Sequence, residues 1–280
     1  MRTVYAKDIT KTVAGLCVLA NVRLREDVHK ALFSALAKET NARAKSILKA
    51  LLDNAAYAWE NKLALCQDTG LPYVFIELGQ EVSIRGGDLI SAINKGIERG
   101  YKQGSLRNSV IRHPLKRDSG SCFSPGIVHV DITRGDHVNL AVLPKGFGSE
   151  NKSAAVMLKP TAGLEKIVEF VIKSVKEAGA NACPPFVIGV GIGGGFDQAA
   201  LLAKKALLRP IGRKNRDKVL ARLEKRLLKQ INGLGIGPMG LGGKTTSLGV
   251  NILTSPTHIA GLPVAVNISC HVLRSASKRL

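Results

Sequence analysis

The chain has 280 residues, with 41 Lys and Arg against 21 Asp and Glu, and its formal net charge is +20. Hydrophobic residues make up 45% of it and there are 29 glycines, which excludes a disordered chain because the apolar side chains can bury a sizeable core. It contains no run of 18 apolar residues, so a membrane-spanning helix is excluded. We expect a soluble, cytoplasmic protein whose five cysteines are thiols or metal ligands, not disulfides.

In the first half of the chain, the apolar spacing predicts three helices, a strand, a fourth helix and a hairpin. They lie, in this order, at residues 13–20, within 25–61 (two helices), at 73–78, around 89–97, and at 126–132 with 137–143, the hairpin turning at 133–136.

In the second half, the pattern predicts helices and strands that do not alternate strictly. Helices are expected at 163–178, 197–208 and 218–231, and strands at 186–190, 248–253 and 263–269. Such a mixture favours an α+β (mixed α/β) fold with helices packed around mixed sheets. Because no internal repeat or Ser/Pro-rich linker is visible, we expect one compact unit over residues 1–280.

The positive charge is concentrated in residues 201–230, which hold eleven basic and two acidic residues. A basic segment of this kind is typical of proteins that bind nucleic-acid phosphates. No Phe, Tyr or Trp follows Phe196, however, so the segment lacks the aromatic platform on which single strands stack. Nucleic-acid binding is therefore disfavoured as the main function, and a solvated face or contact with an acidic partner chain is the alternative.

Two glycine-rich segments resemble nucleotide-binding loops only in part. Residues 189–194 fit G-x-G-x-x-G between a strand and a helix, but no second strand ending in an acidic residue follows about twenty residues later. Either Asp197 caps a helix whose N-terminus faces an anion, or the glycines permit close packing. Residues 243–246 read Gly-Lys-Thr-Thr, but Pro238 replaces the first glycine of a phosphate loop. Backbone approach to a cofactor or substrate is the favoured purpose of both loops.

Three cysteines have distinctive neighbours. Cys66 opens Cys-Gln-Asp-Thr-Gly, Cys183 precedes two prolines, and Cys270 ends the last predicted strand. A cysteine followed by proline recurs at iron–sulfur ligands, yet a lone cysteine is more often a small buried hydrophobe. No C-x-x-C pair is present, which disfavours a zinc ribbon or a thioredoxin-type site. Spacing alone leaves the role of these cysteines open.

Taken together, four segments resemble class I fumarate hydratases and are similar also to the α subunit of L-tartrate dehydratases. They are Cys66–Gly70 (CQDTG), Pro144–Asn151 (PKGFGSEN), Cys183–Pro185 with Gly189–Gly194, and Gly237–Thr246 (GPMGLGGKTT). The resemblance runs in order over essentially the whole chain, whose length is that of a separate α subunit. It implies a hydro-lyase that hydrates fumarate to malate, with tartrate as the alternative substrate.

The resemblance further implies a [4Fe–4S] cluster held by Cys66, Cys183 and Cys270. Three protein ligands leave one iron open to bind substrate oxygens as a Lewis acid. Cys17, within an apolar helical stripe, and Cys122, in a loop, are left out of this ligand set.

The same resemblance implies which side chains contact a small dicarboxylate. The implied substrate-binding residues are Gln67, Asp68, Arg107 and Gly148. Asp68 and His258 are the implied catalytic residues, and His258 is expected to face the same site as Cys270, twelve residues later.

In the family, the remaining acid/base and substrate-binding residues come from a β subunit or a further domain. We therefore expect a chain that is inactive alone and assembles with a β subunit, as α₂β₂. Two alternatives from other classes stay open: a basic nucleic-acid-binding protein, and a scaffold that carries a cluster without catalysis.

Overall fold

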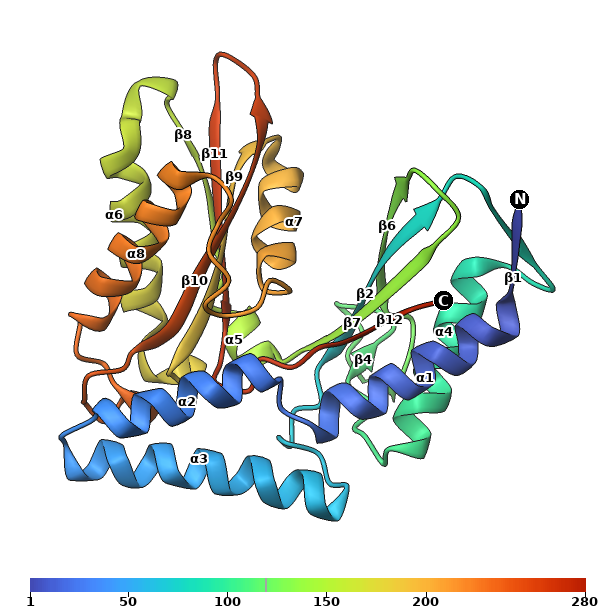
Figure 1. Ribbon diagram of the computed structural model, residues 1–280, viewed down its shortest axis with the longest axis horizontal. Coiled ribbons are helices and arrows are strands. Elements are labelled where there is room, and N and C mark those ends of the chain that lie inside the picture. The colour runs from blue at the N-terminus through green and yellow to red at the C-terminus, as the bar shows by residue number, and fades with distance from the viewer. Residues whose placement is uncertain (119) are drawn as a thin grey trace. The chain divides into compact units, whose positions relative to one another are not determined.

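The computed structural model describes residues 1–118 and 120–280, which form two compact units (Figure 1). The first unit comprises residues 1–25, 55–146 and 274–280, and the second comprises residues 26–54 and 147–273. Both combine helices with mixed sheets, so the α+β class is confirmed. The single unit expected from the sequence thus consists of two parts, and no change in composition marks where the chain passes between them. That residues 1–280 act as one domain stays a prediction.

The first unit is a four-stranded sheet covered by two helices. Its sheet order is β12-β7-β2-β6, and two smaller pairs, β1 with β3 and β4 with β5, accompany it. The elements are β1 (Arg2–Tyr5), α1 (Ala6–Val22), β2 (Leu71–Gly79), β3 (Val82–Arg85), α4 (Leu89–Gln103), β4 (Val110–Ile111), β5 (Ser121–Cys122), β6 (Ile127–Thr133), β7 (Val138–Lys145) and β12 (Ala276–Arg279).

Helices α1 and α4 pack closely because glycine replaces a side chain where they cross. A Cβ at Gly100 would lie 2.5 Å from the carbonyl oxygen of Ala14, and one at Gly96 would lie 2.8 Å from that of Thr10. The two helices share one apolar core with the sheet, to which Ile9, Val13, Val74, Ile93 and Val142 belong. Burial of these aliphatic side chains stabilises this unit.

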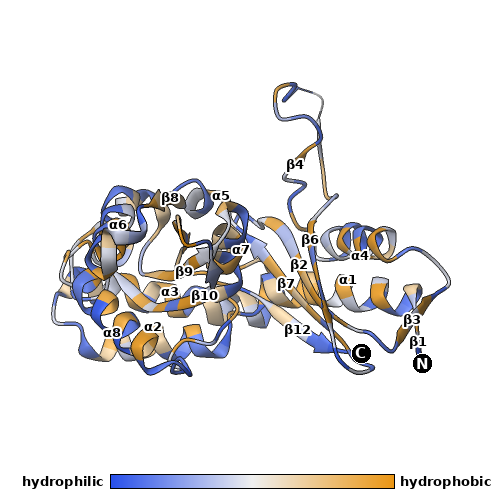
Figure 2. Cartoon of the chain, turned by 90° about the horizontal axis from the view of Figure 1, so that it is seen from above, coloured by the Kyte–Doolittle hydropathy of each residue, from blue (hydrophilic) through white to orange (hydrophobic). Residues whose placement is uncertain are grey.

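The hairpin predicted for residues 126–143 is wrong, although both of its strands exist. Strand β2 lies between them and pairs with β6 in parallel and with β7 antiparallel, so that Tyr73 faces Ile127 on one side and Leu143 on the other. The end of β2 is held there because Gly79 N donates to His137 O and Gln80 N to Thr133 O. The largely hydrophobic β2 (Figure 2) takes the buried centre of the sheet.

The second unit is a sheet of order β10-β9-β11-β8 with helices on both faces. Helices α6 and α8 cover one face and α7 covers the other (Figure 1). The elements are α2 (Glu26–Lys38), α3 (Ala42–Asn61, which ends in the first unit), α5 (Phe147–Glu150), β8 (Ala154–Leu158), η1 (Pro160–Ala162), α6 (Gly163–Ala178), η2 (Gly179–Ala182), β9 (Phe186–Gly194), α7 (Phe196–Ala206), α8 (Lys218–Asn232), η3 (Pro238–Gly240), β10 (Ser247–Thr257) and β11 (Leu262–Ser269).

The predicted charged helix is confirmed as α8. Asp217 caps it by accepting hydrogen bonds from the amides of Val219 and Leu220, at 2.7 and 3.2 Å. Its apolar stripe, which includes Leu223 and Leu227, is buried against the sheet. The basic residues of this helix therefore decorate its outer side.

Among the described residues, no helix combines the length with the apolar composition that spanning a lipid bilayer requires.

Candidate functional site

The Cys66–Gly70 loop joins α3 to β2 in the first unit and is fixed by its own hydrogen bonds. Asp68 Oδ1 accepts from Gly70 N at 2.9 Å. The hydroxyl of Tyr101 donates to the carbonyl oxygens of Thr69 and Gly70, both at 3.0 Å. Tyr101 is 1% exposed, and burial raises the pKa of its phenol well above the ordinary value of 10.0, so it stays a protonated donor.

Arg107 lies beside this loop although it is far away in the sequence. Its backbone amide donates to Thr69 Oγ1 at 2.9 Å, and Thr69 itself is buried. The Arg107 side chain is exposed, as is that of Gln67, whose Oε1 accepts from the thiol of Cys66 at 3.3 Å. The structure thus places three predicted residues, Gln67, Asp68 and Arg107, on one loop cluster.

The Pro144–Gly146 segment approaches the same loop backbone to backbone. A Cβ at Gly70 (φ +77°) would lie 2.8 Å from Lys145 N, and a Cβ at Gly146 would lie 3.2 Å from Asp68 Oδ2. At Gly70 a side chain would therefore clash with the neighbouring backbone, and at Gly146 it would press on the Asp68 carboxylate. Two of the motifs quoted from the sequence therefore meet at Asp68.

Arg274 also contacts the loop, and the sequence analysis missed it. The side chain is 3% exposed, its Nη2 donates to Asp68 O, and its Nε donates to Pro144 O at 3.4 Å. A buried arginine is uncommon unless it is paired. The only signal in the sequence is that Arg274 follows Cys270 by four residues.

In the second unit, Cys183 and Cys270 are brought side by side. Cys183 ends η2 in a left-handed conformation (φ +53°). Its carbonyl oxygen accepts from the backbone amide of His271 at 3.2 Å and lies 3.1 Å from His271 Nδ1, which can only be a donor there. Because His271 directly follows Cys270, these contacts join two of the three predicted ligand positions, 87 residues apart in the chain.

The residues around Cys183 are contacted by two glycine-containing segments, one at Met239 and Gly240 and the other at Gly148. Met239 N donates to Pro184 O at 2.8 Å, and a Cβ at Gly240 would lie 2.2 Å from the Cβ of Ala180. On the other side, the Cβ position of Gly148 is 4.0 Å from Asn181 O. The predicted substrate-binding Gly148 therefore lies near the Cys183 turn.

The glycines of β9 serve close packing. A Cβ at Gly189 or Gly191 would lie 2.0 Å from the carbonyl oxygen of Ala203 or Ala199 on α7. The packing interpretation of the G-x-G-x-x-G pattern is confirmed. The alternative in which Asp197 caps the helix is wrong, because α7 begins at Phe196 and Gly195 occupies the N-cap position.

The Gly243–Thr246 loop meets a carboxylate of the chain itself. Glu39, 2% exposed, accepts from Lys244 N at 2.7 Å and from the amides of Thr40 and Asn41 at 2.8 and 3.0 Å. Burial tends to raise the pKa of Glu39, but these hydrogen bonds outweigh it and lower the pKa. The amide of Lys244 is thus satisfied by an internal anion.

His258 lies away from the Cys183 turn. It is exposed in the connection between β10 and β11, where Gly261 N donates to its carbonyl oxygen and Ala260 N to its Nδ1. Cys270 follows the opposite end of the eight-residue β11, which spans about 27 Å at about 3.4 Å per residue. The expectation that His258 and Cys270 face one site is therefore not met within this chain, because an extended strand separates them.

The surroundings of the five thiols divide them into two groups. Cys17 is fully buried, and burial raises its pKa to about 12, so it is a poor metal ligand. Cys122 Sγ donates to the carbonyl oxygens of Val110 and Ser124, at 3.3 and 3.0 Å. Like Cys122, the thiols of Cys66, in the first unit, and of Cys183 and Cys270, in the second, are partly exposed.

The part of the chain that the structure describes contains no group of three His, Cys, Asp or Glu side chains that could hold a single metal ion. Within the second unit, Cys183 and Cys270 are partly exposed thiols on adjoining turns. Cysteine thiolates are the usual ligands of iron–sulfur clusters, so the chemistry of this pair fits two ligands of such a group.

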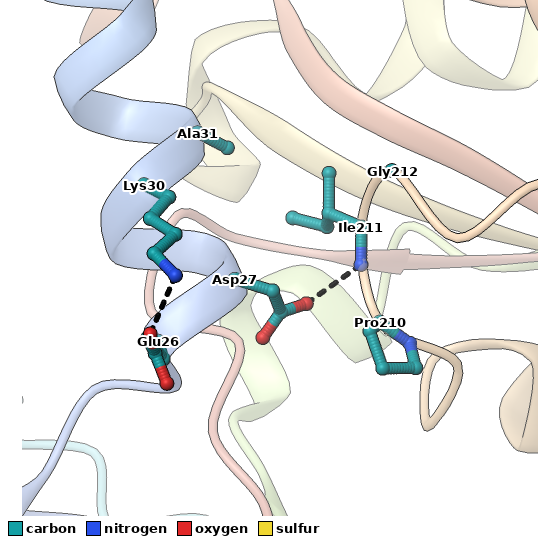
Figure 3. Close-up of a pocket in the computed structure, with 7 residues that line it drawn as sticks. All are labelled: Glu26, Asp27, Lys30, Ala31, Pro210, Ile211 and Gly212. Atoms are coloured by element: carbon teal, nitrogen blue, oxygen red, sulfur yellow. Dashed lines mark hydrogen bonds and ion pairs between the residues drawn. The ribbon is translucent and has the colours of Figure 1, made fainter.

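A pocket of about 600 Å³ in the second unit lies between α2 and the 210–212 loop (Figure 3). Asp27 Oδ2 accepts from Ile211 N at 2.7 Å across it, and Lys30 pairs with Glu26 at its rim. None of the residues lining it belongs to the quoted motifs, so it is separate from the candidate site.

The basic segment contributes to the fold as well as to the surface. Lys204 is buried and paired with Glu150, and burial lowers its pKa. Arg209 pairs with Glu224, which also accepts from Ile252 N. The exposed cations of this segment are Arg213, Lys214, Arg216, Lys218, Arg222, Lys225 and Lys229.

Comparison with known proteins gives consistent matches over nearly the whole chain. The profile of the family described as fumarate hydratase (Fumerase) matches residues 10–279. A Methanocaldococcus jannaschii protein named putative L(+)-tartrate dehydratase subunit alpha is 44% identical over 278 residues, which is 97% of either chain.

Two further relatives are named L(+)-tartrate dehydratase subunit alpha. The protein from an Escherichia coli strain is 31% identical over 275 residues, covering 97% of this chain and 90% of its own. The protein from Shigella boydii is 31% identical over 265 residues, covering 94% and 87%. The matched residues include parts of both units.

Proposed function

The chain belongs to the fumarate hydratase (Fumerase) family of hydro-lyases, and on that premise we propose that it is the α subunit of an iron–sulfur enzyme that hydrates fumarate to malate. The observation that carries the proposal is the loop cluster of the first unit, where Gly70 N holds the Asp68 carboxylate, Thr69 holds the backbone of Arg107, and Tyr101 holds the loop itself. A carboxylate and an exposed arginine on one loop cluster suit a substrate that has both an acidic group to bind and a proton to move.

Each residue of the cluster has a proposed task. Arg107 binds one carboxylate of the substrate through the paired N–H groups of its guanidinium. Gln67 donates a hydrogen bond to the substrate, and Asp68 takes or returns a proton. Gly148, next to the Cys183 turn, leaves room for close approach to the backbone. His258 is left out of this set because of its distance from Cys270 along β11.

We propose that Cys66, Cys183 and Cys270 hold a [4Fe–4S] cluster. When bound, the iron without a protein ligand supplies a Lewis acid toward the hydroxyl and carboxylate oxygens of the substrate. The hydrogen bonds that join the turns of Cys183 and Cys270 support this ligand set. A cytoplasmic location is proposed with it, since thiol ligands stay reduced there.

A β subunit is the proposed partner. The relatives of this chain are named as α subunits, and the described residues near Asp68 include one exposed arginine, whereas a dicarboxylate presents two anionic ends. We propose that the β chain supplies the second cationic group and a further acid/base residue, in an α₂β₂ assembly.

L-tartrate is the second candidate substrate, because the relatives are named tartrate dehydratase subunits. Tartrate differs from malate by one hydroxyl. A site that hydrogen-bonds that hydroxyl discriminates strongly against the substrate lacking it. The two candidates are therefore distinguished by assay of one preparation with both substrates.

The test is anaerobic reconstitution of the chain with its β partner, followed by assays of fumarate hydration and L-tartrate dehydration. We expect iron-dependent turnover by the complex and none by the isolated α chain. Full activity of the α chain alone would refute the subunit proposal. Salt-dependent retention on DNA without iron binding would instead favour the nucleic-acid alternative.

A further inference from the structure

We propose that Arg274 is a positioning residue that holds Asp68 in its working orientation. The inference rests on the proposed function, in which Asp68 takes part in proton transfer. Arg274 does so from inside the protein, through a hydrogen bond to the peptide of Asp68.

The contacts of Arg274 join two segments that meet at Asp68. Its Nη2 donates to Asp68 O, and its Nε donates to Pro144 O at 3.4 Å. Two carbonyl oxygens from chain segments more than seventy residues apart are thus held by one planar, rigid group. This arrangement fixes the peptide plane of Asp68 relative to the strand end at Pro144.

The remaining guanidinium nitrogen, Nη1, indicates that Arg274 does more than stabilise the fold. Arg274 Nη1 is buried, and among the described residues no hydrogen-bond acceptor reaches it. A buried donor without a partner costs about 1–3 kcal/mol, and more when it is charged. A side chain chosen only to stabilise the loop would avoid this cost, so a gain elsewhere is expected to offset it.

The Asp68 carboxylate has little freedom once its peptide is fixed. Oδ1 accepts from Gly70 N, and Oδ2 lies 3.2 Å from the position that a Cβ at Gly146 would occupy. That same Cβ would be 3.9 Å from Arg274 Nη2. A movement of the peptide therefore moves the carboxylate, and misplacement by about 1 Å costs about 100-fold in rate.

Asp68 follows Cys66 by two residues. Arg274 therefore acts, within the first unit, on the loop that also carries a proposed cluster ligand.

The test compares Arg274→Gln and Arg274→Lys in the reconstituted complex with the β chain. We expect Arg274→Gln to lower kcat by about 10- to 100-fold, with KM and iron content near those of the wild type. Arg274→Lys restores part of kcat, because it keeps one donor to Asp68 O. In the apo α chain, hydrogen exchange of residues 66–70 becomes faster in Arg274→Gln.

Arg209→Gln is the matched control, since Arg209 is a mostly buried, paired arginine of the second unit. It is expected to lower the melting temperature and to leave kcat and exchange at residues 66–70 unchanged. If Arg274→Gln behaves in the same way, the positioning role is refuted.

Gly146→Ala keeps the proposal testable if Arg274→Gln does not fold. The added methyl displaces Asp68 Oδ2 while Arg274 stays, so a similar loss of kcat is expected, and an unchanged kcat would contradict the proposal. Asp68→Asn tests the proposed role of Asp68 separately from that of Arg274. Should it keep full activity, the proposed role of Asp68 fails; should it lose activity while Arg274→Gln keeps it, only the inference about Arg274 fails.

Discussion

Thr69 Oγ1 accepts a hydrogen bond of 2.9 Å from the backbone amide of Arg107, across 38 residues of chain. This bond and the two that Tyr101 donates set the loop that carries Asp68 next to the start of the segment that carries Arg107. The proposed binding of a dicarboxylate depends on this closeness.

Thr69→Val removes the acceptor but keeps the shape of the side chain. Because Thr69 is buried, the Arg107 amide is left without a partner, which costs about 1–3 kcal/mol. We expect a rise in KM for the dicarboxylate of about tenfold, because the exposed Arg107 side chain is no longer held in place. Steady-state kinetics of the reconstituted complex measure it.

Thr133→Val is the control for that variant. Thr133 Oγ1 is buried, and no acceptor or donor among the described residues contacts it, so its removal should leave KM unchanged and should not lower the stability. An equal rise in KM in both variants would show that Thr69 has no particular link to substrate binding.

Glu39 provides a pH-dependent contribution to stability. Its pKa is lowered in the folded chain from an ordinary value of 4.5, so its contribution is complete above that value and is lost as the pH falls through the lower folded pKa. We expect Glu39→Gln to reduce the free energy of unfolding at pH 7 and to flatten its decline below about pH 4.5. Urea denaturation at a series of pH values tests this; parallel curves for the two proteins would contradict it.

Gly191→Ala tests the packing role of the G-x-G-x-x-G segment. The added Cβ would lie 2.0 Å from Ala199 O, so β9 and α7 must separate, and we expect a loss of at least about 1–3 kcal/mol. Gly15→Ala, in α1, is the control: the Cβ meets no described atom within 4 Å, and the helix should gain about 1 kcal/mol. Thermal melting distinguishes them, and an unaffected Gly191→Ala would refute the packing role.

Local sequence patterns predicted the elements better than their pairing. The helix expected at residues 163–178 has those bounds in the structure, because its apolar residues repeat with a helical period that is visible locally. The place of β2 between β6 and β7 was not predictable, since strand pairing depends on contacts far apart in sequence. The division into two units was hidden for the same reason.

The candidate site shows the same limit. The resemblance identified the loop of Asp68, through Cys-Gln-Asp-Thr-Gly, and the turn of Cys183, through the two prolines that follow it. Arg274 carries no such mark, and its contact with Asp68 follows only from the folded chain. Conversely, the twelve-residue spacing of His258 and Cys270 suggested closeness, whereas β11 between them is extended.

The central claim is tested most directly by iron and sulfide analysis of the anaerobically reconstituted complex, in the wild type and in single Cys→Ala variants. We predict about four irons per α chain in the wild type and in Cys122→Ala, and loss of the iron in Cys66→Ala, Cys183→Ala and Cys270→Ala. Full iron content in any of these last three variants would contradict the proposed ligand set, and a wild-type complex without iron would contradict the account as a whole.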